Sequence, residues 1–168
     1  EQDYRYWHSA YEIPALQKGW LKKIQRNHGM EIGIQHIITF NLRKAKFRDR
    51  RVRQALSLAM DFDWWNKTLQ FGYGTRAESY WPDTELTAVG LPSAGEISLV
   101  SDYRDLIPTE FFTKAFRFTE VLTEGQHRAK MVEARRLLEE AGFNVQKGVL
   151  YGEDGEPFEL EFISQNSE

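Results

Sequence analysis

The segment from Phe40 to Asp61, FNLRKAKFRDRRVRQALSLAMD, restricts the possible folds more than any other part of this sequence. Its apolar residues repeat at the spacing of one helix face, at Val52, Ala55, Leu56 and Ala59. Asp49 stands just before this pattern and is a good N-cap. Alternating apolar residues from Ile32 to Phe40 predict a strand immediately upstream. We therefore expect a strand that leads through a turn into a capped helix.

Further helices are predicted from the same kinds of signal. The strongest spans about Gln126 to Ala141, with Gly142 placed to end it. A second begins at Asp61 or Asp63 and ends at Gly72, and a long loop follows it to Gly95. Shorter helices are expected from Pro14 to Gly19 and after the start signals at 91–96 and 106–110. Near the end of the chain, apolar and acidic residues alternate from Phe158 to Phe162. A turn-forming segment, 152–155, separates this stretch from Val149 to Tyr151, so we expect the two stretches to pair as a hairpin.

Length and composition favour a single compact globular domain. The chain has 168 residues, 41% of them hydrophobic, and no apolar run approaches the roughly 20 residues that cross a bilayer. Cysteine is absent, which removes disulfides and thiolate chemistry but leaves the compartment open. Because the chain starts at Glu1 and stops just after a strand-like run, we expect it to be a piece of a longer protein.

Charge is distributed unevenly along the chain and raises a nucleic-acid alternative. Residues 1–53 carry twelve Lys or Arg against five Asp or Glu, whereas residues 54–168 carry ten against twenty. Seven of the eleven residues from Arg43 to Arg53 are basic, enough to contact several phosphates. These residues fall on a loop and then around a helix start, so they do not obviously share one face. No base-stacking signature accompanies them, but nucleic-acid binding stays open as an alternative.

Motifs for catalysis or metal binding are not apparent in the sequence. The histidines have no ligand spacing on a common helix, at His8, His28, His36 and His127. No catalytic triad pattern, glycine-rich phosphate loop or nucleophile elbow can be quoted. We expect no catalytic residue, metal or cofactor, and an uncharacterised hydrolase remains a second alternative.

The loop from Phe71 to Pro82, FGYGTRAESYWP, is the best candidate for a recognition surface. It places large rings beside hydroxyl groups and one arginine. Rings give contact area at a low entropic cost, and the polar groups fix the orientation of a ligand. The competing interpretation is that these rings fold back to cover the neighbouring helices. The residues alone favour neither interpretation.

Two blocks of the sequence resemble one known family. The order of Asn41, Phe47 with Asp49, RVRQAL at 51–56 and AMD at 59–61 resembles the motif of the family 5 extracellular solute-binding proteins, the oligopeptide, dipeptide and nickel type. EARRLLEEAGF at 133–143 is similar to a second helix of that family. The long insertion from Leu86 to Gln126 resembles the subgroup linked to oligopeptides and microcin C type peptides.

This resemblance implies a fold class and a domain organisation. Family members have two lobes that close on ligand about a hinge and are several times longer than this chain. The implied fold is α+β (mixed α/β), as a fragment of one lobe of a type II periplasmic-binding-protein fold. Residues 1–34 would connect from the first lobe, and residues 35–168 would be part of the second, C-terminal lobe.

The resemblance also implies a function. The intact protein would be the periplasmic binding component of an ABC importer. It would act as a monomer, capturing oligopeptides and delivering them to a permease in the inner membrane. Relatives hold the peptide main chain by hydrogen bonds and leave side chains in hydrated pockets. The ligand-binding residues implied in this sequence are Asn41, Arg76, Ser79, Tyr80 and Trp81.

Overall fold

The computed structural model describes residues 4–25, 37–118 and 123–164. Contacts within the chain define two compact units. The first unit contains Glu1–Ile38 and Phe62–Glu120, and the second contains Thr39–Asp61 and Val121–Glu168. Each unit is thus built from two separate stretches of sequence and is described by itself. The predicted division into 1–34 and 35–168 within a single domain stays a prediction.

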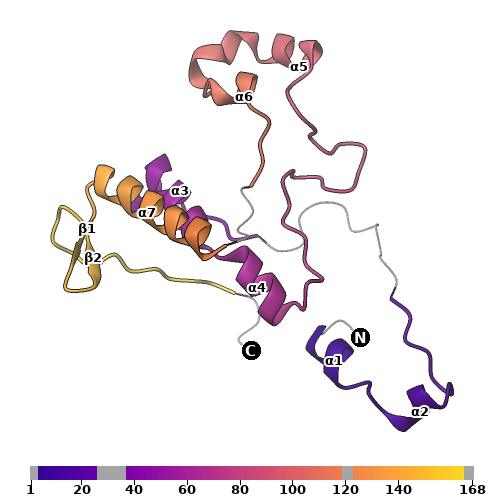
Figure 1. Ribbon diagram of the computed structural model, residues 1–168. Helices are drawn as coiled ribbons and strands as arrows, with labels where there is room; N and C mark the ends of the chain where they lie inside the picture. The colour runs from indigo at the N-terminus through magenta and orange to yellow at the C-terminus, as the bar shows by residue number, and fades with distance from the viewer. Residues whose placement is uncertain (1–3, 26–36, 119–122, 165–168) are drawn as a thin grey trace. The chain divides into compact units, whose positions relative to one another are not determined.

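A pair of helices forms the core of the second unit. Helix α3 (Arg50–Ala59) lies beside helix α7 (Glu124–Glu140), and the two pack through their apolar faces (Figure 1). Ala55, Ala134 and Leu137 are buried together in one cluster. Small side chains at such a contact let two helices approach closely. The two strongest helices predicted from the sequence are therefore confirmed.

The buried face of α3 differs from the predicted one at its end. Val52 is completely buried and Ala55 nearly so, as expected. Ala59 is instead exposed, and Leu58 packs against the buried cluster. Helix α3 ends at Ala59, and Met60 is already extended. The prediction for Ala59 was wrong because Val52, Ala55 and Leu58, each three positions apart, also lie along one side of a short helix.

Local signals define both ends of α7. At its start, Thr123 and Gln126 form a capping box in which each side chain bonds the other residue's backbone N–H. At its end, Gly142 has a φ of +89°, the left-handed conformation that suits glycine after a helix. A Cβ added to Gly142 would lie 2.7 Å from Oε1 of Glu153. The predicted role of Gly142 as the helix stop is thus confirmed.

The second unit contains a regular hairpin just before the predicted one. Strand β1 (Asn144–Gln146) pairs antiparallel with strand β2 (Val149–Tyr151). The two-residue turn between them, Lys147 and Gly148, has positive φ at both positions, as a type I′ turn requires. Residues 158–162 form no strand, although Tyr151 bridges to Pro157 and the Phe158 N–H donates to the Leu150 carbonyl at 2.7 Å. The predicted turn is thus present, closed by this antiparallel bridge, but its second arm does not continue as a strand over 158–162.

Aromatic rings attach the last described stretch to the second unit. Phe47, on the short 3-10 helix η1 (Ala45–Phe47), is buried, with its ring centroid 6.5 Å from that of Phe158. The Phe143 ring meets Phe158 edge to face, with centroids 5.0 Å apart. Such edge contacts are a favourable geometry for aromatic pairs. They hold the chain after β2 against the start of α3.

The first unit contains short helices joined by irregular segments. They are α1 (Tyr4–Ser9), α2 (Pro14–Gln17), α4 (Phe62–Leu69), α5 (Ala94–Leu99), the 3-10 helix η2 (Ser101–Leu106) and α6 (Glu110–Thr113). The helices predicted near 14–19 and 61–72, and those predicted from the start signals at 91–96 and 106–110, are all present. Most of the strand predicted from Ile32 lies outside the described residues, and 37–40 are irregular.

Helices and one two-stranded sheet together confirm the α+β class. The helices outnumber the strands among the described residues, and the sheet covers only β1 and β2. Over the described ranges, no helix has both the length and the apolar character needed to cross a membrane.

Candidate functional site

Residues 79–88, which we call the ring loop, are held in shape by hydrogen bonds of their own. Oγ of Ser79 accepts from the backbone N–H of Trp81 at 3.3 Å and of Ala88 at 3.0 Å. The Thr84 hydroxyl donates to the Trp81 carbonyl at 2.9 Å. Ser79 thus joins the first and last residues of the loop. Its predicted role in ligand binding stays a prediction, but its oxygen already has two donors.

Two aromatic side chains near the start of this loop are exposed. Tyr80 is 76% exposed and Trp81 is 45% exposed. Rigid amphipathic rings of this kind supply contact area at a low entropic cost and are frequent energetic centres of interfaces. Of the predicted ligand-binding residues in the first unit, these two present the most side-chain surface.

Arg76 lies just before the ring loop and packs against aromatic rings. Its guanidinium carbon is 3.6 Å from the centroid of Phe118 and 5.7 Å from that of Phe62. Burial lowers the pKa of Arg76, while the charges of Asp63 and Glu78 act in the opposite direction. Guanidinium groups stack well on ring faces and gain most where water is excluded. Arg76 therefore supports the base of the loop, and its predicted contact with ligand is untested.

Glu78 is a residue that sequence reasoning missed. Its Oε1 accepts from the Phe118 N–H at 2.8 Å, and its Oε2 pairs with the guanidinium of Arg117. The hydrogen bond from the Phe118 N–H and then that from Arg117 lower the pKa of Glu78. We call Glu78 with these two partners the Glu78 junction. No pattern in the sequence pairs positions this far apart.

Asn66 makes a second link that the sequence did not reveal. Its side-chain oxygen accepts from the Gly74 N–H and its side-chain amide donates to the Gly74 carbonyl, both at 2.8 Å. The Asn66 carbonyl also accepts from Gly72 at 2.9 Å. A Cβ on Gly74 would lie 2.8 Å from Oδ1 of Asn66. Asn66 thus orients the chain that leaves α4 towards the ring loop, and Gly74 is required for that close approach.

Asn41, the remaining predicted ligand-binding residue, belongs to the second unit. It is exposed, and its side-chain oxygen accepts from the Arg43 N–H at 3.1 Å. This bond within a turn is typical of asparagine and leaves the side-chain amide with its own donors. Nothing in the geometry of the second unit tests whether Asn41 contacts a ligand.

Most of the basic segment from Arg43 to Arg53 is engaged within the second unit. Lys44 pairs with Glu161 at 2.9 Å, and Lys46 donates to the Glu159 carbonyl. Arg48 donates to the carbonyls of Leu42 and Arg43 at 3.2 and 3.3 Å. These contacts turn several positive groups towards the chain's own backbone. A continuous phosphate-binding face, as the nucleic-acid alternative needs, is therefore disfavoured.

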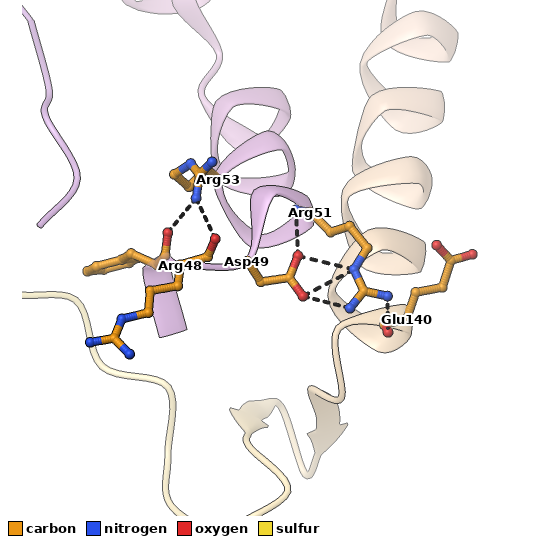
Figure 2. Close-up of polar contacts among 6 residues, drawn as sticks. Arg48, Asp49, Arg51, Arg53 and Glu140 are labelled. Atoms are coloured by element: carbon orange, nitrogen blue, oxygen red, sulfur yellow. Dashed lines mark hydrogen bonds and ion pairs between the residues drawn. The ribbon is translucent and has the colours of Figure 1, made fainter. Parts of the chain in front are cut away.

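Figure 2 shows the arginines at the start of α3. Arg53 donates to the carbonyls of Phe47 and Arg48 at 2.6 and 2.8 Å. Two nitrogens of the Arg51 guanidinium donate to the carboxylate of Asp49. A third donates to the Glu140 carbonyl at 2.5 Å. Asp49 in turn accepts from the Arg51 N–H at 2.8 Å as the N-cap. One carboxylate therefore caps α3 and orients the arginine that reaches the end of α7.

Replacing Asp49 with alanine should lower the free energy of unfolding by about 1 kcal/mol, because α3 loses its cap. Asp49→Asn keeps a capping oxygen and should cost less. The bond from Arg51 lowers the pKa of Asp49. The stabilisation from its charge is therefore present above the unfolded pKa of about 3.9 and lost as pH falls through the lowered folded value.

Thermal unfolding of the wild-type and Asp49→Asn proteins at about pH 7 and about pH 2 measures this effect. The difference between them should be present at the higher pH and shrink at the lower one. A difference that is the same at both pH values would contradict the role of the carboxylate charge.

Acidic and histidine side chains do not gather into a metal site in the described ranges. No group of three or more His, Asp or Glu there could hold a metal ion. His127 is 3.3 Å from Asp61, which is a pair and not a coordination sphere.

The sequence matches one protein family over nearly its whole length. Residues 6–168 match the family described as bacterial extracellular solute-binding proteins, family 5 Middle. The chain therefore belongs to the family 5 extracellular solute-binding proteins. This confirms the resemblance seen in the segments 40–61 and 133–143. Membership of a solute-binding family favours binding over hydrolysis.

Curated relatives agree with this family. A "Probable peptide-binding protein YejA" from Agrobacterium fabrum (strain C58 / ATCC 33970) is 30% identical over 96% of this chain and 26% of its own length. An "Uncharacterized protein YejA" from Escherichia coli (strain K12) is 32% identical over 100% of the chain and 28% of its own length. A "Peptidoglycan-binding protein YepA" from Agrobacterium fabrum (strain C58 / ATCC 33970) is 30% identical over 98% of this chain and 27% of its own length. The chain spans about a quarter of the length of these relatives.

Proposed function

We propose that the whole protein is the periplasmic substrate-binding component of an ABC importer, which captures oligopeptides and delivers them to a permease in the inner membrane. The family match over residues 6–168 carries this proposal. The printed name of one relative, a probable peptide-binding protein, supports the choice of peptide as ligand. The proposed protein acts as a monomer and needs no cofactor, and residues 35–168 contribute to its second lobe.

The residues proposed to contact ligand are Asn41, Arg76, Ser79, Tyr80 and Trp81, each considered within its own unit. Tyr80 and Trp81 supply ring surface, with 76% and 45% of their surface exposed. Asn41 offers side-chain amide donors that suit the carbonyls of a peptide main chain. Arg76 and Ser79 complete the proposed set, mainly by holding the ring loop. Hydrogen bonds to main chain are shared by all peptides, so such a site accepts many sequences.

Capture by such a protein is a shift in population between an open and a closed form. The ligand favours the closed form only by as much as it binds that form more tightly. Exposed rings on a loop of fixed shape contribute to this difference, because their surface is covered only when ligand is present. No covalent step is part of the proposal.

Isothermal titration calorimetry of the whole protein tests the ligand class. The panel contains mixed peptides of several lengths, a peptidoglycan-derived peptide fragment, a sugar and a divalent metal. Binding of a peptide ligand with favourable heat is the expected result. The cell-wall fragment is included because one relative is named as peptidoglycan-binding. Tight binding of the sugar or the metal, with no heat from any peptide, would overturn the proposal.

The nucleic-acid alternative has its own measurement. Gel-shift titrations of the whole protein with single-stranded and duplex oligonucleotides at two salt concentrations should show no specific complex. The contacts of Lys44, Arg48 and Arg51 within the second unit support this expectation. A complex that weakens steeply with salt would restore the basic segment as a phosphate-binding surface.

A further inference from the structure

Two stretches that are distant in the sequence meet at the base of the ring loop. Glu78 and Arg117 are 39 positions apart, and Glu78 and Phe118 are 40 positions apart. Both partners bind the same carboxylate, one through its guanidinium and one through its backbone N–H. The Glu78 junction therefore closes residues 79–116 into one large loop within the first unit.

The side chains around the junction exclude water from part of it. The Arg76 guanidinium lies 3.6 Å from the centroid of the Phe118 ring. The backbone N–H of the same residue, Phe118, donates to the Glu78 carboxylate. Arg76, Phe118 and Glu78 are each only partly exposed. A hydrogen bond to a charged group contributes more than a neutral one, and more still where solvent is limited. Arg76 and Glu78 thus hold the same residue, Phe118, by two different interactions.

The junction is directly continuous with the ring loop. Glu78 is bonded covalently to Ser79, whose hydroxyl oxygen accepts from Trp81 and from Ala88. A displacement of the backbone at Glu78 is therefore passed to Ser79, and through its hydrogen bonds to the backbone at Trp81. Loops that keep one shape before binding lose less entropy when a ligand arrives. The position of the Tyr80 and Trp81 rings thus depends on a carboxylate that does not itself need to touch the ligand.

We propose that Glu78 is a positioning residue for ligand binding, which holds the base of the ring loop to residues 117–118 and so fixes where Tyr80 and Trp81 are presented. This inference rests on the proposed function for the identity of the ligand. Its structural part, the dependence of the ring loop on Glu78, concerns the unliganded protein and can be tested without any ligand.

Two substitutions separate the interactions of Glu78. Glu78→Gln keeps an oxygen that can accept from the Phe118 N–H but removes the ion pair with Arg117, whereas Glu78→Ala removes both. Loss of the exposed ion pair with Arg117, expected in both variants, corresponds to a decrease in peptide affinity of about 3-fold. Loss of the hydrogen bond between the Phe118 N–H and the charged carboxylate, expected only in Glu78→Ala, corresponds to a decrease of about 10-fold. We expect the alanine variant to bind peptide at least as weakly as the glutamine variant.

Glu110→Gln is the matched control. Glu110 is exposed at the start of α6, within the same closed segment but outside the junction and the ring loop. This variant removes one negative charge, as Glu78→Gln does, and should bind peptide like the wild-type protein. Thermal unfolding of all variants identifies any that simply fail to fold.

Two measurements on the whole protein test whether Glu78 positions the ring loop. Calorimetry gives peptide affinity, and hydrogen exchange of the unliganded protein gives the protection of the Phe118 amide and of residues 79–88. In Glu78→Ala the Phe118 amide should exchange about tenfold faster and the ring loop should lose protection, with the midpoint of unfolding nearly unchanged. Unchanged exchange in the loop, or affinity equal to wild type despite faster exchange, would overturn the proposal. Faster exchange in a protein that binds no peptide at all would instead contradict only the proposed ligand class.

Discussion

Leu137→Ala should lower the free energy of unfolding of the second unit by about 2–4 kcal/mol, the usual cost of removing a large side chain from a core. Leu137 is buried in the cluster where α7 meets α3, together with Ala55 and Ala134. Neither alanine can extend to fill the space that the leucine leaves. The contact between α3 and α7 is also the main contact between helices of this unit, so few other groups can compensate.

Val132→Ala provides the control for this substitution. Val132 is on the same helix, and it is 63% exposed. Because its side chain covers little apolar surface, its removal should change the free energy of unfolding by less than about 0.5 kcal/mol. Chemical denaturation of the two variants and the wild-type protein makes the comparison. Equal effects of the two substitutions would show that the cluster around Leu137 is not the core of this unit.

Trp81→Ala should weaken peptide binding by about 10- to 100-fold, because tryptophan is the side chain most often found at the energetic centre of an interface. The Trp81 backbone is held by Ser79 and by Thr84, so the indole ring is presented from a loop of fixed shape. Tyr80→Ala, at the more exposed ring, should have a smaller effect. Calorimetry with the best peptide of the panel measures both.

Trp20→Ala is the matched control for the ring loop. Trp20 is 74% exposed and lies after α2, outside the ring loop. Its removal deletes an exposed indole of the same size and should leave peptide affinity within about twofold of wild type. If Trp81→Ala binds as tightly as Trp20→Ala does, the proposed role of Trp81 in binding is wrong.

Much of the helical structure could be predicted because its signals are local. Asp49 lies directly before the helix that it caps, and Gly142 lies directly after the helix that it ends. The turn between Tyr151 and Pro157 could be predicted from its glycines, but the hairpin of β1 and β2 just before it could not. The Lys147 and Gly148 turn has the backbone of a type I′ hairpin, but lysine is not a typical residue at its first position.

The site was less predictable because its contacts join distant parts of the sequence. The composition of residues 71–82 marks a candidate recognition surface but does not decide whether its rings are exposed, and in the structure Tyr80 and Trp81 are exposed. The carboxylate of Glu78 meets Phe118 40 positions away, and no sequence pattern indicates such a pair. The charge of the segment from Arg43 to Arg53 raised a nucleic-acid alternative that the contacts of its side chains disfavour. Arg51 and Lys46 bind the carbonyls of Glu140 and Glu159, which a count of charges cannot reveal.

The second unit is interrupted in the sequence, since Thr39–Asp61 and Val121–Glu168 build it while residues 62–120 lie between them. Each doubling of the length of a flexible connection costs only about 0.6 kcal/mol in closure entropy. Changes in the length of the irregular segments between α3 and α7 should therefore have little effect on that helix pair. The same stretch contains the ring loop, so the sequence of that loop can change while the contact between α3 and α7 is kept.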